Sequence, residues 1–385
     1  MLLDNKYNPD PRVQKSISCI LEAGFSVSLF CVKDSNHPNF EDFEFFKVYR
    51  IFDKNLNQYY KINLDSKIDF IVNTEPNISQ SIIFANDHVC LNIAVALKKR
   101  FPDVKLIYDA HEYIQGWPYY QNEKKLFTKI KGFFVHKIIS RNERKNLKYV
   151  DNLLTVSDGI ANLFRIKNPN LKIEVIRNVP PKITINKEKV ELFKNKLKLP
   201  QDKLIITHSG AAYYSEEVLC WFFDCIAQFS QELNLHFLFI ANDKTIERLK
   251  SIKNYSNASK FISYHPYVQY SDLVNLLNVA DCGLILNFKT NWLSHWFSLP
   301  NRIFDYTNAE LALLSTPQPE FYNFIKKTDN GVFFEINNTN EFSESIKKLK
   351  YNLDYYKANS ILHKDENTWE IEKNKVINIL KKYRK

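Results

Sequence analysis

The sequence predicts an α/β protein with two domains, and three observations support this prediction. Short apolar runs rich in β-branched residues alternate with stretches of helical periodicity, as in parallel sheets joined by crossover helices. The chain has 385 residues, more than one hydrophobic core usually organises. The alternation pauses around residues 178–200, where two prolines and a lysine-rich stretch precede a new strand. We expect domains at residues 1–185 and 186–363, followed by a final helical segment at 364–385.

The first half should form one buried parallel sheet with helices between its strands. Helical spacing of apolar residues predicts helices at residues 13–23, ending at Gly24, and at 89–100, before Pro102. The predicted strands lie at residues 25–32, 70–74, 81–85, 105–108, 152–156 and 172–176. A very short first strand should precede the loop that carries Arg12.

The second half repeats this alternation. Strands are predicted at residues 204–207, 236–241, 261–264, 283–287, 312–315 and 332–335. A last helix is expected at residues 366–383, after a polar break at 359–365. Because of that break, the last helix should pack away from its own domain.

Composition narrows the class of protein. Hydrophobic residues make up 45% and aromatic residues 14% of the chain, which indicates a globular protein with a large core. The formal net charge of +10 favours contact with phosphates, nucleic acid or an anionic membrane. The six cysteines show no CxxC pair, and no apolar run reaches the length of a membrane span. These features predict a cytoplasmic protein.

Several common nucleotide sites are excluded. With seven glycines, none of them grouped, neither the dinucleotide-binding fingerprint nor the Walker P-loop can be written in this chain. No two aspartates stand in DxD spacing, the carboxylate pair that could hold a metal-bridged diphosphate. We therefore expect a metal-free site.

Residues 298–306 carry the most informative motif. Pro300 suits the first position of a helix, and Ser298 could cap its free amides. Asn301 and Asp305 would share one helix face. Amides at such a start can hold a diphosphate while the carboxylate accepts hydrogen bonds from ribose hydroxyls. An ordinary amphipathic helix with apolar residues 303 and 304 in the core is the alternative.

Six short segments give the chain a family resemblance. They are residues 10–13 (DPRV), 108–112 (YDAHE), 155–161 (TVSDGIA), 175–178 (VIRN), 280–284 (ADCGL) and 299–306 (LPNRIFDY). In this order they resemble family 4 glycosyltransferases, also called glycosyl transferases group 1. The resemblance implies the GT-B architecture, in which an acceptor-binding and a nucleotide-sugar-binding Rossmann-like domain face each other across a cleft. It also implies a hexosyl transfer that needs neither a metal nor an organic cofactor and mostly retains configuration, and a last helix that crosses back to the N-terminal domain.

The resemblance assigns donor-site residues position by position. Asp305 matches the second acid of the family's acid pair, whereas the position of the first acid holds Phe297. Pro300, Asn301 and the helix amides are then expected to hold the phosphates, with Arg302 in place of the usual lysine. After Gly210 the family's arginine and lysine are missing, so Lys244 or Arg302 should neutralise the diphosphate.

The N-terminal half offers candidate catalytic residues at strand ends. His111 and Glu112 follow a predicted strand, and the histidine resembles the family's site histidine. It should contact the transferred sugar or the leaving phosphate, while Glu112 orients it or helps to desolvate the acceptor hydroxyl. Asp87 could contact the acceptor or cap a helix, and Arg12 could meet a phosphate or lie at the surface. Asp109 is expected to be local scaffolding, and a structural histidine at position 111 is the alternative.

Partners and location follow from the same features. Residues 124–139 interleave lysines with apolar side chains and could lie on an anionic membrane, although a single helix more often packs on its own domain. The resemblance implies a glycan or lipid-linked acceptor in the biosynthesis of a bacterial surface polysaccharide such as capsule or lipopolysaccharide. The protein would then be cytoplasmic and peripheral to the plasma membrane. The alternatives are a nucleotide-sugar epimerase on a similar fold and a non-catalytic, basic nucleic-acid-binding protein.

Overall fold

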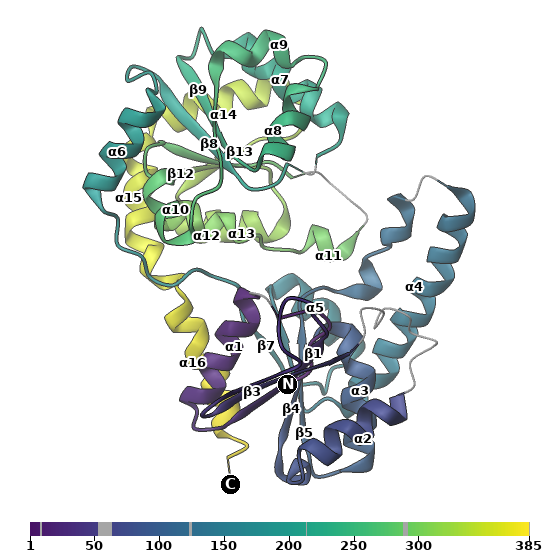
Figure 1. Ribbon diagram of the computed structural model, residues 1–385. Coiled ribbons are helices and arrows are strands. Elements are labelled where there is room, and N and C mark those ends of the chain that lie inside the picture. Colours follow the sequence, from purple (N-terminus) through teal and green to yellow (C-terminus); the bar gives the residue numbers. More distant parts are fainter. Residues whose placement is uncertain (8–9, 53–63, 123–124, 213, 288–291, 385) are drawn as a thin grey trace. The chain divides into compact units, whose positions relative to one another are not determined.

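The chain folds into two compact units. The computed structural model describes residues 1–7, 10–52, 64–122, 125–212, 214–287 and 292–384 (Figure 1). Unit 1 comprises Met1–Asn178, Asn291–Ser298 and Glu372–Lys385, and unit 2 comprises Val179–Thr290 and Leu299–Ile371. The first division falls after Asn178, where the sequence placed it at residue 185. Two segments distant in sequence, at 291–298 and at the C-terminal end, belong to unit 1.

Unit 1 is built on a largely parallel sheet. One part has the order β1-β3-β2 and the other the order β4-β5-β6-β7. Leu2 pairs with Phe30 on one side and Ala85 on the other, so residues 1–3 act as the short central strand that joins the two parts. The strands are β1 (Val27–Val32), β2 (Phe40–Phe43), β3 (Phe46–Phe52), β4 (Ile82–Asn86), β5 (Lys105–Ala110), β6 (Asn152–Thr155) and β7 (Ile173–Val175).

The helices of unit 1 confirm most of the expected elements. The Asp10 carboxylate caps the first helix, Pro11 follows at its first position, and Gly24 ends it with a φ of 82°. The helices are α1 (Pro11–Glu22), α2 (Leu64–Thr74), α3 (Asp87–Arg100), α4 (Leu126–Asn146), α5 (Asp158–Lys167) and the short α11 (Leu293–Trp296).

The strand expected at residues 70–74 is wrong, because these residues end α2. Ile68 and Ile71 are buried three positions apart, whereas Phe70 is exposed, which is a helical pattern of burial. Contact with α3 overrides the β-propensity of the branched side chains. Strands β2 and β3 were missed, although burial alternates along β3.

Unit 2 has a parallel sheet with the order β10-β9-β8-β11-β12-β13. This is a doubly wound arrangement that reverses direction between β8 and β11. The strands are β8 (Leu204–Ser209), β9 (Leu235–Ile240), β10 (Ile262–His265), β11 (Cys282–Ile285), β12 (Ala312–Ser315) and β13 (Gly331–Phe333). All six strands predicted for this half are therefore present.

Helices cover both faces of this sheet. Phe237 and Phe239 join the core formed with α7 and α14, while Leu238 and Ile240 join the core formed with α6, α10, α12 and α13. This alternation explains why the strands read as continuous apolar runs. The helices are α6 (Lys187–Leu197), α7 (Glu216–Phe229), α8 (Asp243–Lys250), α9 (Tyr255–Ala258), α10 (Tyr270–Leu277), α12 (Arg302–Asn308), α13 (Pro319–Thr328), α14 (Thr339–Tyr351) and α15 (Leu353–His363).

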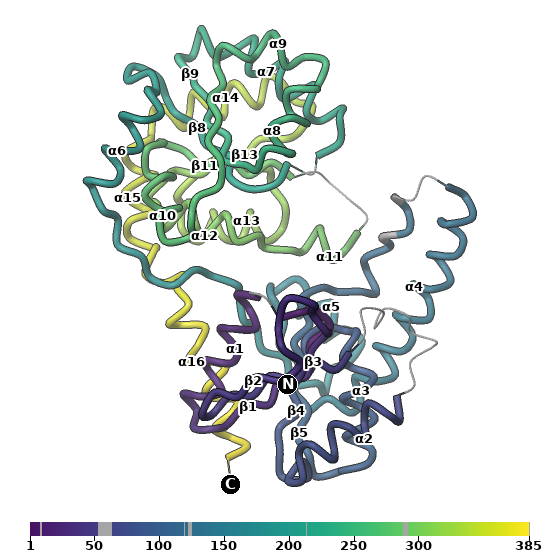
Figure 2. The backbone as a smooth tube through the Cα atoms, viewed as in Figure 1, coloured from purple at the N-terminus to yellow at the C-terminus, as the bar shows by residue number. Residues whose placement is uncertain are grey.

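The final helix α16 (Trp369–Lys381) begins in unit 2 and ends in unit 1. Its Trp369 packs against the core of unit 2, and the Trp369 N–H donates to the Pro180 carbonyl at 2.7 Å. Further along, Lys373 pairs with Glu22 at 2.7 Å, so α16 lies beside α1 (Figure 2). The polar break is shorter than expected, because α15 continues to His363; the buried Ser360 hydroxyl donates to the Leu311 carbonyl and anchors that part of the helix.

Candidate active site

A pocket in unit 2 lies where the doubly wound sheet predicts a ligand. It opens beyond the carboxyl ends of β8 and β10 and over the start of α12, and its volume is about 630 Å³. Ligand sites of such sheets lie at the strand ends near the reversal of strand order, and small-molecule pockets commonly have this size. The lining residues are Ser209, Gly210, Tyr267, Val268, Tyr270, Leu273, Pro300, Asn301, Arg302 and Asp305.

Five of the six residues assigned to the donor site line this pocket. Gly210 follows the end of β8, Pro300 and Asn301 directly precede α12, and Arg302 and Asp305 lie in its first turn. The sixth, Lys244, is exposed in the first turn of α8 and is not part of the lining. Of the two cations that the sequence offered for diphosphate neutralisation, the pocket contains Arg302.

Neutral partners hold the Arg302 side chain. Its Nη1 donates to His208 Nε2 at 2.7 Å and to the Tyr214 hydroxyl at 3.1 Å. Burial and the nearby guanidinium lower the pKa of His208 well below its usual value, so this imidazole is a neutral acceptor. Across the described part of the chain no carboxylate forms an ion pair with Arg302. A partly buried guanidinium whose hydrogen-bond partners are neutral attracts an anionic ligand.

The backbone conformation at Gly210 favours glycine. Its φ of 101° lies in the region that side chains rarely adopt. A Cβ at this position would meet Arg302 Nη2 at 3.5 Å, an ordinary contact distance. The backbone angle, rather than crowding, therefore favours glycine at this edge of the pocket.

Asp305 places a carboxylate on the same pocket. The side chain is 7% exposed, and its Oδ1 accepts a hydrogen bond from the Tyr270 hydroxyl at 2.7 Å. Burial and the Asp305 charge raise the pKa of Tyr270, which therefore stays protonated as a donor. Tyr270 and its neighbour Tyr267, both about half exposed in the pocket lining, were not predicted from the sequence. Their position just after a predicted strand was the available signal.

The helix over this motif begins later than expected. Helix α12 starts at Arg302, so Pro300 precedes it instead of taking its first position. The Pro300 carbonyl accepts the Ile303 N–H at 3.2 Å, which places the first turn over Pro300 and Asn301. Ser298 does not cap the amides, because its hydroxyl donates to the His295 carbonyl at 2.9 Å. Ile303 and Phe304 are buried, which the alternative prediction of an ordinary amphipathic helix also required.

A second group of charged residues gathers in unit 1 around Asp109, at the end of β5. Arg12 lies in α1, and its Nε and Nη2 donate to the two Asp109 oxygens at 3.0 and 2.5 Å. His111 Nε2 lies 3.2 Å from Asp109 Oδ2. Burial alone would raise the pKa of Asp109, but the charges of Arg12 and His111 hold it well below its usual value. Arg12, whose side chain is 12% exposed, is thus an ion-pair partner of Asp109 in helix α1 instead of a surface residue in a loop.

Asp109, not Glu112, orients the candidate histidine. Burial would lower the pKa of His111, but the Asp109 carboxylate raises it above the usual value. Glu112 instead accepts a hydrogen bond from the Ser294 hydroxyl. Burial raises the pKa of Glu112, which makes this carboxylate a stronger proton acceptor than an exposed one. The expectation that Asp109 is local scaffolding understated its role, since it holds both Arg12 and His111.

Asp87 lies close enough to this group to interact with it electrostatically. It opens α3 with a φ of 62°, an uncommon backbone conformation for a residue other than glycine. Its Oδ1 accepts the His88 N–H at 3.0 Å, and the helix cap is Asn86, so the N-cap interpretation of Asp87 is wrong. Burial would raise the pKa of Asp87, but His88 and His111 lower it, and it remains ionised.

Phe297 occupies the position where the family has the first acid of its acid pair. The segment that contains it belongs to unit 1, where the Phe297 side chain packs against the hydrophobic core. The Phe297 carbonyl accepts a hydrogen bond from the Ser157 hydroxyl at 2.6 Å. The side chain at this position therefore contributes to packing within unit 1.

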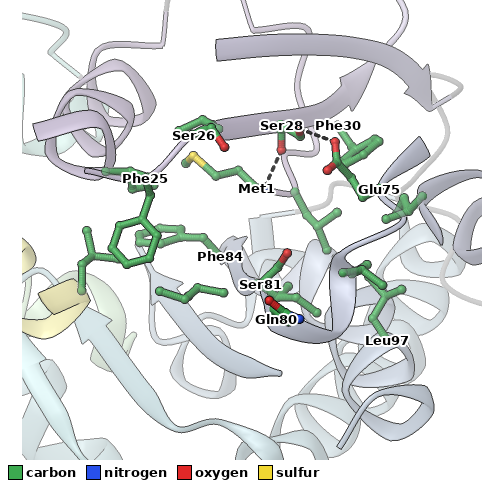
Figure 3. A pocket seen from close by; sticks show the side chains of 18 residues that line it. Met1, Phe25, Ser26, Ser28, Phe30, Glu75, Gln80, Ser81, Phe84 and Leu97 are labelled. Carbon is green, nitrogen blue, oxygen red and sulfur yellow. Dashed lines mark hydrogen bonds between the residues drawn. The ribbon is translucent and has the colours of Figure 1, made fainter. Parts of the chain in front are cut away.

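A smaller cavity of about 210 Å³ in unit 1 contains none of the predicted site residues. It lies at the amino ends of β1 and β4, and Figure 3 shows the Met1 amine and the Ser28 and Glu75 side chains in its wall. The amine donates to the Ser28 carbonyl at 2.7 Å. Ligands of α/β sheets bind at the carboxyl ends of strands, so this cavity is not taken as the substrate site.

Comparisons with known proteins identify the fold. No family model matches the sequence, and no curated protein is similar enough in sequence to be recognised. Among solved structures, sucrose-phosphate synthase from Thermosynechococcus elongatus superposes with a TM-score of 0.73 at 13% identity, covering 99% of this chain and 98% of that chain. HepE from Anabaena, solved with UDP, gives 0.68 at 11% identity, covering 98% of both chains.

A third structure, WaaG, described as a glycosyltransferase of lipopolysaccharide biosynthesis, gives a TM-score of 0.63 at 12% identity and covers 98% of both chains. These structures are GT-B glycosyltransferases, and the present chain has the GT-B fold that the motif resemblance predicted. At such low identity the likeness establishes the fold alone, so the activity must be argued from the pockets and side chains.

Proposed function

We propose that this protein is a glycosyltransferase that moves a hexosyl group from a nucleotide-sugar donor to a glycan or lipid-linked glycan acceptor. The observation that carries the proposal is the pocket of unit 2, where a partly buried cation that pairs with no carboxylate of the described residues and a buried carboxylate line one cavity. Arg302 suits the diphosphate, and Asp305 suits the ribose hydroxyls. HepE, a structural neighbour, was solved with UDP and with UDP-glucose, which supports a UDP-sugar as the first donor to test.

In the proposed reaction the bond between the anomeric carbon and the diphosphate oxygen breaks as the acceptor oxygen bonds to that carbon. Negative charge then develops on the departing nucleoside diphosphate, and Arg302 would stabilise it. The acceptor hydroxyl must lose its proton, and Glu112, with its raised pKa, is the proposed acceptor of that proton. His111, held by Asp109, would contact the transferred sugar or the leaving phosphate. Asp87 would contact the acceptor.

Further parts of the proposal come from the family resemblance. They are retention of configuration, independence from metal ions and a role in making a bacterial surface polysaccharide. In the described ranges no three His, Cys, Asp or Glu side chains form a cluster that could hold a metal ion. Metal independence is tested by measuring transfer with and without a chelator. A cytoplasmic location at the inner face of the plasma membrane belongs to the same proposal.

The test is a binding titration against UDP-, GDP-, ADP- and CMP-linked sugars. Asp305→Ala removes the pocket carboxylate, and Lys244→Ala is the matched control because Lys244 lies outside the pocket. We expect one nucleotide class to bind tightly to the native protein and the control, and weakly to Asp305→Ala. Failure of every nucleotide to bind would overturn the proposal.

The same protein preparation separates the alternatives. An epimerase would convert the donor sugar without an acceptor, whereas a transferase would release nucleoside diphosphate in step with acceptor glycosylation. A nucleic-acid-binding protein would bind nonspecific DNA with an affinity that falls steeply with salt.

A further inference from the structure

Helix α4 in unit 1 carries a group of exposed apolar side chains. Phe127 is 80% exposed and Phe134 59% exposed, and Ile130 and Ile138 lie on the same side of the helix. The sequence left two options for this segment, packing on its own domain or lying on a membrane. The structure packs one side of α4 and leaves these apolar residues in solvent. Lys124, the first residue of that segment, lies outside the described residues.

The packed side of α4 is opposite to this group. Glu143 and Ile139 are buried, and His136 Nε2 lies 2.9 Å from the Ile114 carbonyl oxygen. Gly132 faces Tyr120 so closely that an added Cβ would lie 2.5 Å from the tyrosine Cβ. Phe134, Ile138, Arg141 and Lys145 each follow one of these packed residues by two positions, about 200° around the helix axis, and Phe127 and Ile130 continue the same side toward the start of the helix. We call Phe127, Ile130, Phe134, Ile138, Arg141 and Lys145 the outer face of α4.

Positive charge borders and continues this face. Glu143 is the one acid within Leu126–Asn146, and it is buried. The cations of the helix, all exposed, are Lys129, Lys131, Lys137, Arg141, Arg144 and Lys145. None of them forms an ion pair with a carboxylate of the described residues. At the C-terminal half of the helix they line a shallow groove together with Lys167 and Asn168 from the end of α5.

We propose that the outer face of α4 binds the surface of an anionic lipid bilayer. A helix with apolar side chains at one end of its exposed face, cations around them and no exposed acid suits the boundary between headgroups and acyl chains. The phenylalanines would enter that boundary, while Arg141 and Lys145 would meet lipid phosphates. No described helix combines the length and apolar character needed to span a bilayer, so the contact would be peripheral.

Other occupants fit the charges less well. A second copy of the chain seated on this face would bring cations against cations around the apolar residues, which disfavours a symmetric dimer. An acidic partner protein would pair with the cations, but its acidic side chains would not cover the exposed phenylalanines and isoleucines of this face. The inference does not depend on sugar transfer, because lipid binding needs neither donor nor acceptor.

The experiment measures flotation of the full chain with vesicles of phosphatidylcholine alone and of phosphatidylcholine mixed with phosphatidylglycerol. The native protein should bind the anionic vesicles, less at high salt, and leave the neutral vesicles unbound. Phe127→Ser combined with Phe134→Ser should lower the partition constant at least about tenfold. Arg141→Gln combined with Lys145→Gln should lower it roughly twentyfold.

The matched control is Leu192→Ser combined with Leu362→Ser, since these leucines are 68% and 69% exposed on α6 and α15 in unit 2. The control should bind vesicles like the native protein, and donor titration should be unchanged in every variant. Circular dichroism would show that each variant is folded.

Three outcomes would overturn the proposal. The first is that the native protein does not bind anionic vesicles. The second is that the control variant loses as much vesicle binding as the outer-face variants. The third is that the native protein sediments as a dimer and the phenylalanine variants sediment as monomers. The last outcome would assign the face to a second copy of the chain. Each is distinguishable from failure of the transferase proposal, which the donor titration tests separately.

Discussion

Replacing Arg302 with methionine should weaken nucleotide binding while leaving the folded protein about as stable. The guanidinium contributes charge to the pocket and donates hydrogen bonds to His208 and Tyr214. A hydrogen bond to a charged group contributes about 1.5–3 kcal/mol, and 1.4 kcal/mol is a factor of ten in affinity. Loss of the contact with the diphosphate should therefore raise the dissociation constant of UDP roughly 10- to 100-fold.

Unlike nucleotide affinity, the free energy of unfolding of the ligand-free protein should change little in Arg302→Met. His208 keeps a donor after the substitution, because the Tyr214 hydroxyl lies 2.8 Å from its Nε2. Methionine also removes a partly buried cation, whose partial desolvation opposes folding before any ligand is bound. These effects oppose each other, so the free energy of unfolding should change by no more than about 1 kcal/mol. Thermal unfolding without ligand measures this directly.

Calorimetric titration with UDP and with uridine separates the diphosphate from the nucleoside. Arg302→Met should weaken UDP binding and leave uridine binding unchanged, and Lys244→Met should change neither. Arg302 would have no role at the diphosphate if Arg302→Met bound UDP like the native protein, or if its affinity for uridine fell as much as its affinity for UDP.

Three further predictions concern the carboxylates. Asp305→Asn should lower the affinities for UDP and for uridine alike, by about tenfold, because the lost contact is to the ribose; the same titrations check this, and a loss for UDP alone would contradict it. Asp109→Asn leaves the Arg12 guanidinium buried without a carboxylate and should cost about 3–5 kcal/mol in urea unfolding at neutral pH. Because the pKa of Asp109 is lowered by folding, its stabilisation is present above about pH 4 and is lost as pH falls through the folded-state pKa, so Asp109→Asn should approach the native protein in acid. Burial raises the pKa of Glu143 to about 7, and its carboxyl accepts hydrogen bonds from Tyr108 and Gln115. This group therefore destabilises the fold increasingly as pH rises from about 4 through 7, so Glu143→Gln should gain up to about 3 kcal/mol relative to the native protein between about pH 4 and pH 8; equal stability differences at both pH values would contradict this.

Much of the fold could be predicted because burial on both faces of a parallel sheet leaves a local pattern. The strands of unit 2 are apolar runs bounded by polar residues, and each run corresponds to an observed strand. The failures arose where the pattern is ambiguous. Residues 70–74 have β-branched side chains, yet contact with α3 holds them in a helix. Strand β2 is mostly exposed, so it carries little apolar signal.

The donor-site residues close in sequence were easier to predict than those brought together by folding. Pro300, Asn301, Arg302 and Asp305 lie within six consecutive residues, so spacing alone groups them. The partners of Arg302 come from β8 and the loop after it, about ninety residues earlier in the chain, and nothing in the local sequence marks them. Tyr270 reaches Asp305 from another strand end for the same reason.

The α/β class, most elements and the motif that lines the pocket could be predicted from the sequence, because they depend on periodicity and on residues near one another in the chain. The GT-B expectation came from the resemblance of six short segments to family 4 glycosyltransferases. Only the tertiary structure showed that Asp109 holds Arg12 and His111, that Phe297 packs in unit 1, and that the apolar face of α4 remains in solvent. Each of these depends on which distant side chains supply a partner, and partner choice is set by packing across the whole fold.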